Sequence, residues 1–241
     1  MARIIVFDSG FGSLSIIKPI QQAVKSEIIY FADQKNFPYG QKSIHELTKI
    51  ITKRLELLEE QFKPDLIVVG SNTPSLLVHI KKKNVIKVLP PIKMAAKISV
   101  TGNVAILATH ATIKSKKLSE FIKKSKLPKR IHIKKINTSK LVQLVESVKF
   151  IDDKNLCKRT INKVLNQEFS KYNIDVATLS STHLPFLLSF FNKQFPTVNF
   201  LDPGQEVADK VRKTVKKPSK RNSMKIFTSS KPEKFQKDLS K

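Results

Sequence analysis

Short, wholly apolar runs alternate with longer amphipathic stretches, and this alternation constrains the fold more than any other feature of the sequence. Residues 3–7 and 66–70 ("RIIVF" and "LIVVG") are continuously apolar, as in parallel strands that are buried on both faces. Residues 43–62 instead carry apolar side chains at three- and four-residue spacing, and Ser43 with Glu46 forms a capping box typical of a helix start. Strand, helix and strand repeated in this order predict a doubly wound α/β layer.

The same patterns predict further elements along the chain. The other expected strands are residues 27–33, 102–109, 130–137, 174–180 and 224–230. The other expected helices are residues 13–24, with Pro19 near the first turns, 113–124, 141–148, 154–167 and 231–239. Only residues 213–222 are expected to form a linker. At 241 residues the chain is long enough for one large domain or two small ones.

One strand-end phrase occurs twice. Residues 68–75 read "VVGSNTPS" and residues 178–186 read "TLSSTHLPF". Each is an apolar strand followed by a serine, a polar pair and an apolar run with a proline nearby. By pattern alone this is a weak internal repeat, because short strand-turn-helix phrases recur by chance in α/β proteins. It predicts that the chain passes twice through a similar unit.

The charge balance is strongly basic. The chain has 45 Lys and Arg against 19 Asp and Glu, a formal net charge of +26. A field of this sign attracts nucleic acid, anionic surfaces and anionic metabolites, but it also fits a lysine surface that is simply solvated. There is no Trp, no zinc-finger spacing and no recognisable nucleic-acid module, so nucleic-acid binding rests on bulk charge alone.

A single cysteine and a short N-terminal apolar run bear on compartment and redox state. Cys157 excludes a disulfide framework within one chain, and its place in an apolar helical pattern predicts a buried structural thiol. The run after Met1 breaks at Asp8, which is too short for a signal peptide, and no stretch approaches the roughly 18 apolar residues of a membrane span. The expected location is the cytoplasm, with no membrane contact.

Polar side chains gather after four of the expected strands. They are Asp8 and Ser9; Ser71, Asn72 and Thr73; Thr109 and Thr112; and Ser181, Thr182 and His183. Any one group could be a helix cap or a turn, but ligands of open α/β sheets bind where strands end, and four groups at one edge predict a site. Gly10 and Gly12 lack the third glycine of a dinucleotide fingerprint. His183 fits a proton shuttle or a hydrogen-bonded core histidine, and it has no neighbour at metal-ligand spacing.

Eight segments in order resemble the glutamate racemase family of the aspartate/glutamate racemase superfamily. They are "IIVFDSGFGSLSIIKPI", "IIYFAD", "PYGQKS", "SNTPS", "ATHATIKS", "STHLPFL", "LDPGQEVA" and "FTSSKPEKF". The resemblance implies two similar doubly wound lobes related by a pseudo-twofold axis, with a ligand cleft between them, no cofactor and no metal. We expect residues 1–97 plus 205–241 in the first lobe and residues 98–204 in the second. Dimers are common in the family, so a homodimer is one expected assembly.

The resemblance also implies roles for individual residues. It places Ser71 and Ser181 at the catalytic positions, with His183 beside the second. The substrate would be an acidic amino acid such as glutamate or aspartate, interconverted between its L and D forms. The implied substrate-binding residues are Asp8, Ser9, Tyr39, Gly40, Asn72, Thr73, Thr112, Thr182 and His183.

The reactive positions depart from the family pattern. Family racemases use two cysteines, one on each side of the substrate α-carbon, whereas this chain has Ser71 and Ser181. Pro90 also stands where a glutamate is usual, and Ser13 replaces a glycine. A thiol ionises near pH 8.5 and an alcohol about five units higher, so forming the base costs about 7 kcal/mol more, a rate penalty on the order of 10⁵.

His183 could in principle act as a base for Ser181. Neighbouring positions at a strand-helix corner normally point different ways, however, and no acid orients the imidazole in the sequence, so we expect weak or absent racemisation. Whether the chain is an enzyme stays open. The alternatives are a catalytically inactive protein of the racemase fold that binds an acidic amino acid, and a basic protein associated with nucleic acid.

Overall fold

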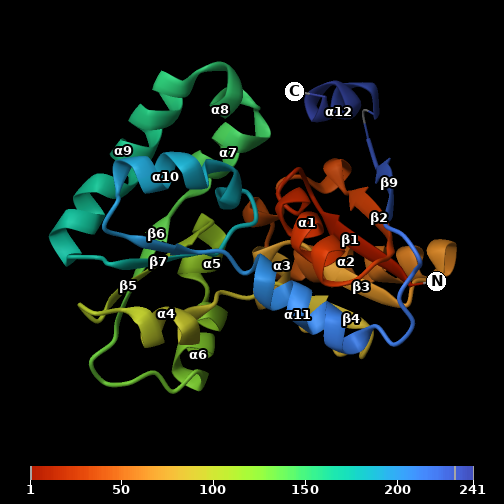
Figure 1. The fold of residues 1–241 in the computed structure, drawn as a ribbon, viewed down its shortest axis with the longest axis horizontal. Coiled ribbons are helices and arrows are strands. Elements are labelled where there is room, and N and C mark those ends of the chain that lie inside the picture. The colour runs from red at the N-terminus through yellow and green to blue at the C-terminus, as the bar shows by residue number, and fades with distance from the viewer. Residues whose placement is uncertain (1, 231, 241) are drawn as a thin grey trace. The chain divides into compact units, whose positions relative to one another are not determined.

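Two parallel sheets organise residues 2–230 and 232–240, which this computed structural model describes (Figure 1). One unit consists of Met1–Val88 and Gly204–Lys241, and the other of Leu89–Pro203. Every strand pair in both sheets is parallel. The expected α/β class with mostly parallel sheets is therefore confirmed, while the expected lobe boundaries, pseudo-twofold axis and cleft stay predictions.

The first unit has a five-stranded sheet in the order β4-β3-β1-β2-β9. Its strands are β1 (Arg3–Asp8), β2 (Glu27–Ala32), β3 (Leu66–Val69), β4 (Val85–Lys87) and β9 (Ser223–Thr228). Its helices are α1 (Leu14–Ala23), η1 (Gln34–Asn36), η2 (Tyr39–Gln41), α2 (Ile44–Phe62), α3 (Asn72–Leu77), α11 (Gly204–Thr214) and α12 (Pro232–Leu239).

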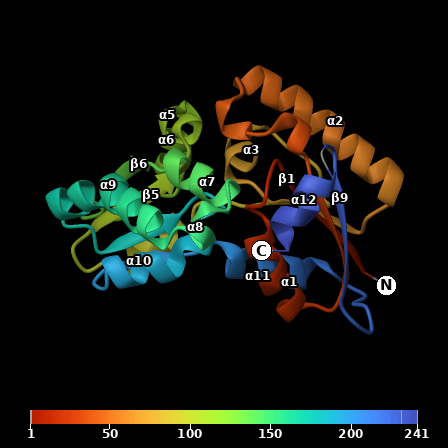
Figure 2. The ribbon, with the colours of Figure 1, turned by 90° about the horizontal axis from the view of Figure 1, so that it is seen from above.

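The first sheet is buried on both faces, as its continuous apolar runs predict. Ile4 and Val6 of β1 and Val68 of β3 belong to one apolar cluster with buried side chains of α1 and α11. Helix α2 covers the opposite face, and Figure 2 shows the sheet between α2 on one side and α1 with α11 on the other. The N-cap half of the expected capping box is present, because the backbone N–H of Glu46 donates to Ser43 Oγ at 3.2 Å, and the Glu46 carboxylate pairs with Lys42 at 3.0 Å.

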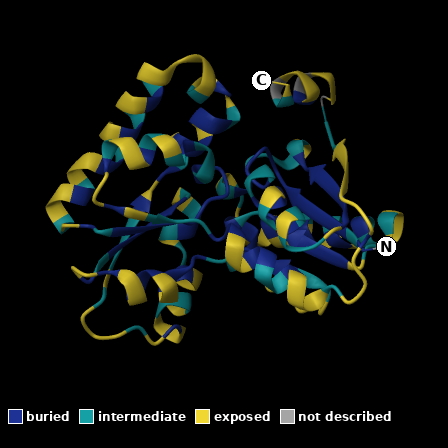
Figure 3. Cartoon of the chain, viewed as in Figure 1, coloured by how far each residue is buried: buried dark blue, intermediate teal, exposed yellow. Residues whose placement is uncertain are grey.

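The C-terminal segment completes the first unit. Strand β9 pairs in parallel with β2 and forms an edge of the sheet, where most of its residues are exposed (Figure 3). Phe235 of α12 stacks on Phe11 with ring centroids 4.7 Å apart. The expected linker at residues 213–222 is partly wrong, because α11 continues through Thr214 and Ser219 is buried, its N–H donating to Lys25 O at 2.7 Å. Lys231, the first residue of the expected last helix, lies outside the described residues.

The second unit has a four-stranded sheet in the order β6-β5-β7-β8. Its strands are β5 (Asn103–Ala108), β6 (His132–Asn137), β7 (Val176–Leu179) and β8 (Asn199–Leu201). Its helices are α4 (Ile92–Ile98), α5 (His110–Lys114), α6 (Lys116–Lys124), α7 (Ser139–Glu146), α8 (Lys149–Asp152), α9 (Lys154–Tyr172), η3 (Leu184–Leu187) and α10 (Leu188–Gln194).

Both faces of the second sheet are covered by apolar side chains. Leu107 of β5 and Leu179 of β7 pack in the main cluster with α7, α9 and α10. On the other face Val104 and Val176 meet Ala95 of α4. The single helix expected over residues 113–124 is two helices, because the chain breaks at Ser115, whose Oγ accepts from Leu118 N–H at 3.1 Å. Among the described helices, none combines the length and the apolar character needed to span a bilayer.

The two sheets share one strand order. From its edge the first reads β4-β3-β1-β2 and the second reads β8-β7-β5-β6, with β9 added only to the first. In each unit the first strand therefore lies between the second and the third. The serine phrases follow β3 and β7, which occupy the same place in the two sheets. The internal repeat inferred from those phrases has this topological counterpart.

Candidate functional site

The first corner lies where β1 and β3 end side by side. Phe7 and Val69 are paired, and the N–H of Gly70 donates to Phe7 O at 2.8 Å, so Asp8 and the serine phrase begin at one edge. Asp8 is fully buried, and the N–H of Ser9 donates to its Oδ1 at 2.6 Å. This short contact orients the Asp8 carboxylate, and Ser9 Oγ lies 3.5 Å from the same oxygen.

Ser71 is the N-cap residue of α3, but its side chain makes no cap hydrogen bond. Asn72 and Thr73 are the first residues of that helix and both are buried. Asn72 Nδ2 donates to Val88 O at 3.3 Å, whereas Asn72 Oδ1 is buried without a hydrogen-bond partner in the described part of the chain. A buried acceptor of this kind is costly unless a donor reaches it, which fits a residue that contacts a ligand.

Gly70, which precedes Ser71, packs against Ser13, the residue that replaces a glycine of the family pattern. A Cβ on Gly70 would lie well inside contact distance of Ser13 Cβ and 3.1 Å from Phe7 O. Ser13 Oγ is itself buried without a hydrogen-bond partner among the described residues. The first corner is therefore tightly packed and has no room for a side chain at position 70.

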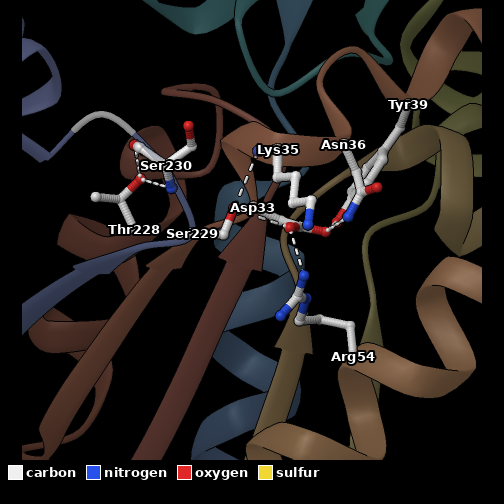
Figure 4. A network of polar contacts seen from close by, with 8 residues as sticks. All are labelled: Asp33, Lys35, Asn36, Tyr39, Arg54, Thr228, Ser229 and Ser230. Atoms are coloured by element: carbon white, nitrogen blue, oxygen red, sulfur yellow. Dashed lines mark hydrogen bonds and ion pairs between the residues drawn. The ribbon is translucent and has the colours of Figure 1, made fainter.

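A buried carboxylate holds the segment that carries Tyr39 (Figure 4). Asp33 directly follows the last residue of β2 and is fully buried. Its Oδ2 accepts from Tyr39 Oη at 2.9 Å and from Asn36 Nδ2 at 2.8 Å, and its Oδ1 accepts from Arg54 at 2.7 Å and from Ser229 Oγ at 3.1 Å. We call Asp33 with these four partners the Asp33 network.

Burial, more than the Asp33 network, keeps the Tyr39 phenol protonated. Burial, followed by the nearby carboxylates of Asp33 and Asp8, raises the pKa of Tyr39 well above its ordinary value. Tyr39 is therefore a neutral hydroxyl donor at physiological pH. Gly40 follows it in η2 and is half-buried. The sequence did not single out Asp33 or Arg54, although a carboxylate directly after a buried strand signals the need for a cationic partner.

The second corner lies where β7 ends beside β5. The N–H of Ser180 donates to Leu107 O at 2.9 Å, and Ser180 Oγ shares a 2.8 Å hydrogen bond with Thr178 Oγ1. Ser181, Thr182 and His183 follow in a turn and are all buried. The turn leads into η3, so no α-helix begins directly after the serine as it does after Ser71.

His183 joins Ser181 to a carboxylate that is distant in the sequence. Ser181 Oγ lies 3.4 Å from His183 Nδ1, and His183 Nε2 pairs with Oε1 of Glu146, the last residue of α7. The expectation that Ser181 and His183 point apart, with no acid to orient the imidazole, is therefore wrong. The turn lets the ring reach back to Ser181, and α7 supplies the acid. We call Ser181, His183 and Glu146 the Ser181 relay.

The threonines expected after β5 lie together at the same edge of the second sheet. Thr109 is the N-cap residue of α5, and its Oγ1 shares a 3.1 Å hydrogen bond with Thr112 Oγ1. Thr112 is fully buried. Thus Thr112, Thr182 and His183 belong to the second unit, whereas Asp8, Ser9, Tyr39, Gly40, Asn72 and Thr73 belong to the first.

Two other chemistries can be weighed from the described residues. No cluster of three or more His, Cys, Asp or Glu side chains in residues 2–230 and 232–240 could hold a metal ion. Cys157 is fully buried on α9, and burial raises its pKa to about 11. A thiol of this kind is unreactive at neutral pH, so Cys157 is structural.

The chain has relatives among known proteins. No family model matches the chain. A glutamate racemase of Actinobacillus pleuropneumoniae serotype 7 is 31% identical over 227 residues, covering 91% of this chain and 84% of the relative. The solved structure of isoform RacE1 of glutamate racemase from Bacillus anthracis has a TM-score of 0.84 at 24% identity, covering 98% of this chain and 91% of that one.

A second solved structure carries a ligand. The glutamate racemase of Francisella tularensis, in complex with D-glutamate, has a TM-score of 0.81 at 25% identity and covers 98% of this chain and 91% of its own. The sequence relative extends over most of both chains, and the solved structures share the two-lobe α/β fold. This chain therefore belongs to the glutamate racemase family and is a racemase-like protein.

Proposed function

We propose that this chain binds an acidic amino acid, glutamate in the first place, and interconverts its L and D forms slowly and without a cofactor. The observation that carries the proposal is the equivalence of Ser71 and Ser181, each of which lies two residues after the end of the third strand of its unit, in sheets with the same strand order. A two-sided proton transfer needs one such group in each lobe. The family relative that binds D-glutamate supports the choice of ligand.

The polar groups at the corners suit an amino acid with two carboxylates and one ammonium. The buried Asp8 carboxylate is an acceptor for an ammonium group. Thr73 and Thr182 are hydroxyl donors for carboxylate oxygens, and the oxygen of Tyr39, whose one proton goes to Asp33, can accept from the ammonium group. Asn72, Ser9, Gly40 and Thr112 lie beside them in the same two corners. In this proposal both corners act on one ligand.

The proton transfers are unequal in this proposal. Ser181 can pass its hydroxyl proton to His183, whose imidazole is held by Glu146. Ser71 makes no side-chain cap hydrogen bond, and no histidine in the described part of the chain is paired with it in this way. An alkoxide is a much stronger and scarcer base than a thiolate, so turnover falls far below that of a cysteine racemase. The alternative is a protein that binds the amino acid and leaves its α-proton in place.

Proton exchange into the amino acid distinguishes these outcomes. The protein is incubated with L- and D-glutamate and with L- and D-aspartate in D₂O, and loss of the α-proton signal is followed by NMR. Slow exchange that is lost in Ser71→Ala and in Ser181→Ala supports the enzyme. Glutamate-dependent thermal stabilisation without exchange supports the binding protein. The absence of both α-proton exchange and thermal stabilisation would contradict the proposal.

Nucleic-acid binding and a homodimer stay predictions. The first rests on the net charge of +26 alone. Its test is binding of duplex DNA at low and high salt, which should fall steeply as salt rises and should not change in Ser71→Ala or Ser181→Ala.

A further inference from the structure

We propose that Ser181 is an activated nucleophile that accepts acyl groups from activated carboxylic esters, giving the chain a slow esterase activity distinct from amino-acid racemisation. Serine nucleophiles need a base within hydrogen-bond reach and a group that orients the base. The Ser181 relay supplies both within one unit of the chain, with Ser181 Oγ 3.4 Å from His183 Nδ1 and the other ring nitrogen paired with Glu146 Oε1.

The geometry fits nucleophilic chemistry. A separation of 3.4 Å is longer than the usual 2.6–3.2 Å reach, as is common in such pairs when no substrate is bound. Here Nδ1 faces the hydroxyl and Nε2 faces the carboxylate. Either imidazole nitrogen can accept a proton while the other donates, so the relay works in this orientation.

Burial strengthens the interactions in the Ser181 relay. Ser181 is 5% exposed, and the side chains of His183 and Glu146 are 7% and 12% exposed. A carboxylate beside an imidazole attracts a transferred proton more strongly when water is largely excluded. The serine is also held in place, because Leu184 N–H donates to Ser181 O at 3.0 Å. The neighbouring Ser180 hydroxyl is committed to Thr178, which leaves Ser181 as the hydroxyl that faces the base.

The proposed reaction balances without a further reactant except water. Ser181 Oγ attacks the ester carbonyl carbon while its proton moves to His183 Nδ1. The bond from the carbonyl carbon to the leaving alcohol breaks, and the leaving oxygen takes the proton from His183. Water then attacks the acyl-serine, gives a proton to His183 and releases the carboxylic acid as Ser181 regains its proton. Glu146 stays ionised throughout and stabilises the imidazolium.

Two probes test the proposal, p-nitrophenyl acetate and a fluorophosphonate, in the absence of any amino acid. The full chain should release p-nitrophenolate, and mass spectrometry should find the phosphonyl adduct on the peptide that contains Ser181. Ser181→Ala should lose the adduct. Glu146→Gln, which keeps the size of the side chain, should slow both reactions at least about 100-fold. Ser189→Ala, at an exposed serine on α10, is the matched control and should react as the unmodified chain does.

A loss of esterase activity can be distinguished from a loss of folding and from a loss of racemase activity. Circular dichroism and thermal unfolding show whether each variant is folded, and Glu146→Gln keeps the test valid if Ser181→Ala does not fold. Ester hydrolysis that is equal in the full chain and in Ser181→Ala would overturn the proposal, as would an unmodified Ser181 after treatment of folded protein. Because no amino acid is present, failure here leaves the proton-exchange experiment on glutamate unaffected.

Discussion

The corners that carry Ser71 and Ser181 have the same strand order but differ in the side chains that surround the serine. Ser71 and Ser181 follow equivalent strands, yet Ser71 begins a helix at once, whereas Ser181 begins a turn. The residue two positions on is Thr73 in the first corner and His183 in the second. Because the turn brings the His183 ring back to Ser181, the second serine contacts an imidazole that is paired with a carboxylate, and residues 2–230 and 232–240 show no such contact for Ser71. Repetition of a fold therefore does not repeat its acid–base groups.

The packing of the corners differs in the same way. The first corner is braced by the Asp33 network and by the close approach of Ser13 to Gly70. At the position equivalent to Gly70, the second corner has Ser180, whose side chain fits and bonds to Thr178. Thus the first corner has no space for a side chain at the position where the second corner holds a serine hydroxyl.

The largest effect should come from restoring thiols one corner at a time. Ser181→Cys should raise the α-proton exchange rate of glutamate more than Ser71→Cys does, because His183 can take the thiol proton. The double variant should gain up to about 10⁵-fold, since the thiol removes most of the cost of forming the base. The measurement is NMR in D₂O with L-glutamate and with D-glutamate.

Ser189→Cys, at an exposed position near the start of α10, should give no gain and controls for a surface thiol. Equal rates in the two single variants would show that the Ser181 relay has no influence on proton transfer and would remove the distinction between the corners.

Loss of the Asp33 carboxylate should give the next largest effect. Asp33→Asn leaves the Arg54 guanidinium, whose side chain is only 16% exposed, without its buried ion-pair partner. The free energy of unfolding should fall by about 3 kcal/mol, measured by urea denaturation. Asp209→Asn breaks an exposed ion pair with Arg212 and should change stability by less than about 1 kcal/mol. Similar losses in the two variants would mean that the network does not brace the first corner.

A side chain at position 70 tests the packing difference directly. Gly70→Ala should destabilise the protein by about 2 kcal/mol, because the new Cβ collides with Ser13 Cβ and approaches Phe7 O. Ser180→Ala, the equivalent change in the second corner, loses one hydroxyl bond and should cost about 1 kcal/mol. Thermal unfolding of both variants gives the comparison. The penalty at Gly70 should shrink in a Ser13→Gly background, and an unchanged penalty would place the strain elsewhere.

Lowering the pH should have the smallest effect on stability, and it should act on both units. Hydrogen bonds from Lys225 and Arg3 lower the pKa of Glu27 in the first unit. In the second, burial raises the pKa of Asp175, but hydrogen bonds from Ser99, Thr101 and the Val100 N–H outweigh it, so the pKa is lowered.

A lowered folded-state pKa means that the stabilisation from each carboxylate is present above its unfolded pKa, about 4, and is lost as the pH falls through the folded value. The free energy of unfolding, measured by urea denaturation at a series of acid pH values, should therefore decrease as the pH is lowered. Asp175→Asn should flatten that dependence by less than one proton, and an unchanged slope would exclude Asp175 as a contributor.

Much of the fold was predictable because it depends on local pattern. The apolar runs fall on β1, β3, β5 and β7, and the Ser43 N-cap starts α2. The break at Ser115 was missed because Ser115 caps a new helix in the middle of an apparently continuous amphipathic pattern.

The residues at the strand ends of the candidate site were predictable from the sequence, but their contacts with distant residues were not. The serine phrases and the strand-end polar groups were visible in the sequence. Glu146 was not, because it lies 37 residues before His183 and meets it only once α7 packs beside the turn. Ser229 likewise reaches Asp33 across 196 residues. Contacts at such separations depend on tertiary packing, which the local pattern does not encode.

The return of residues 204–241 to the first sheet has a consequence for synthesis. Strand β9 pairs with β2, and buried side chains of α1 and α11 share one apolar cluster, so the first unit is incomplete until the last segment has left the ribosome. The second unit has all its strands by residue 201 and can finish earlier. Chains truncated before α11 would expose a strand edge and an apolar helix face, and these are the surfaces through which nascent chains aggregate.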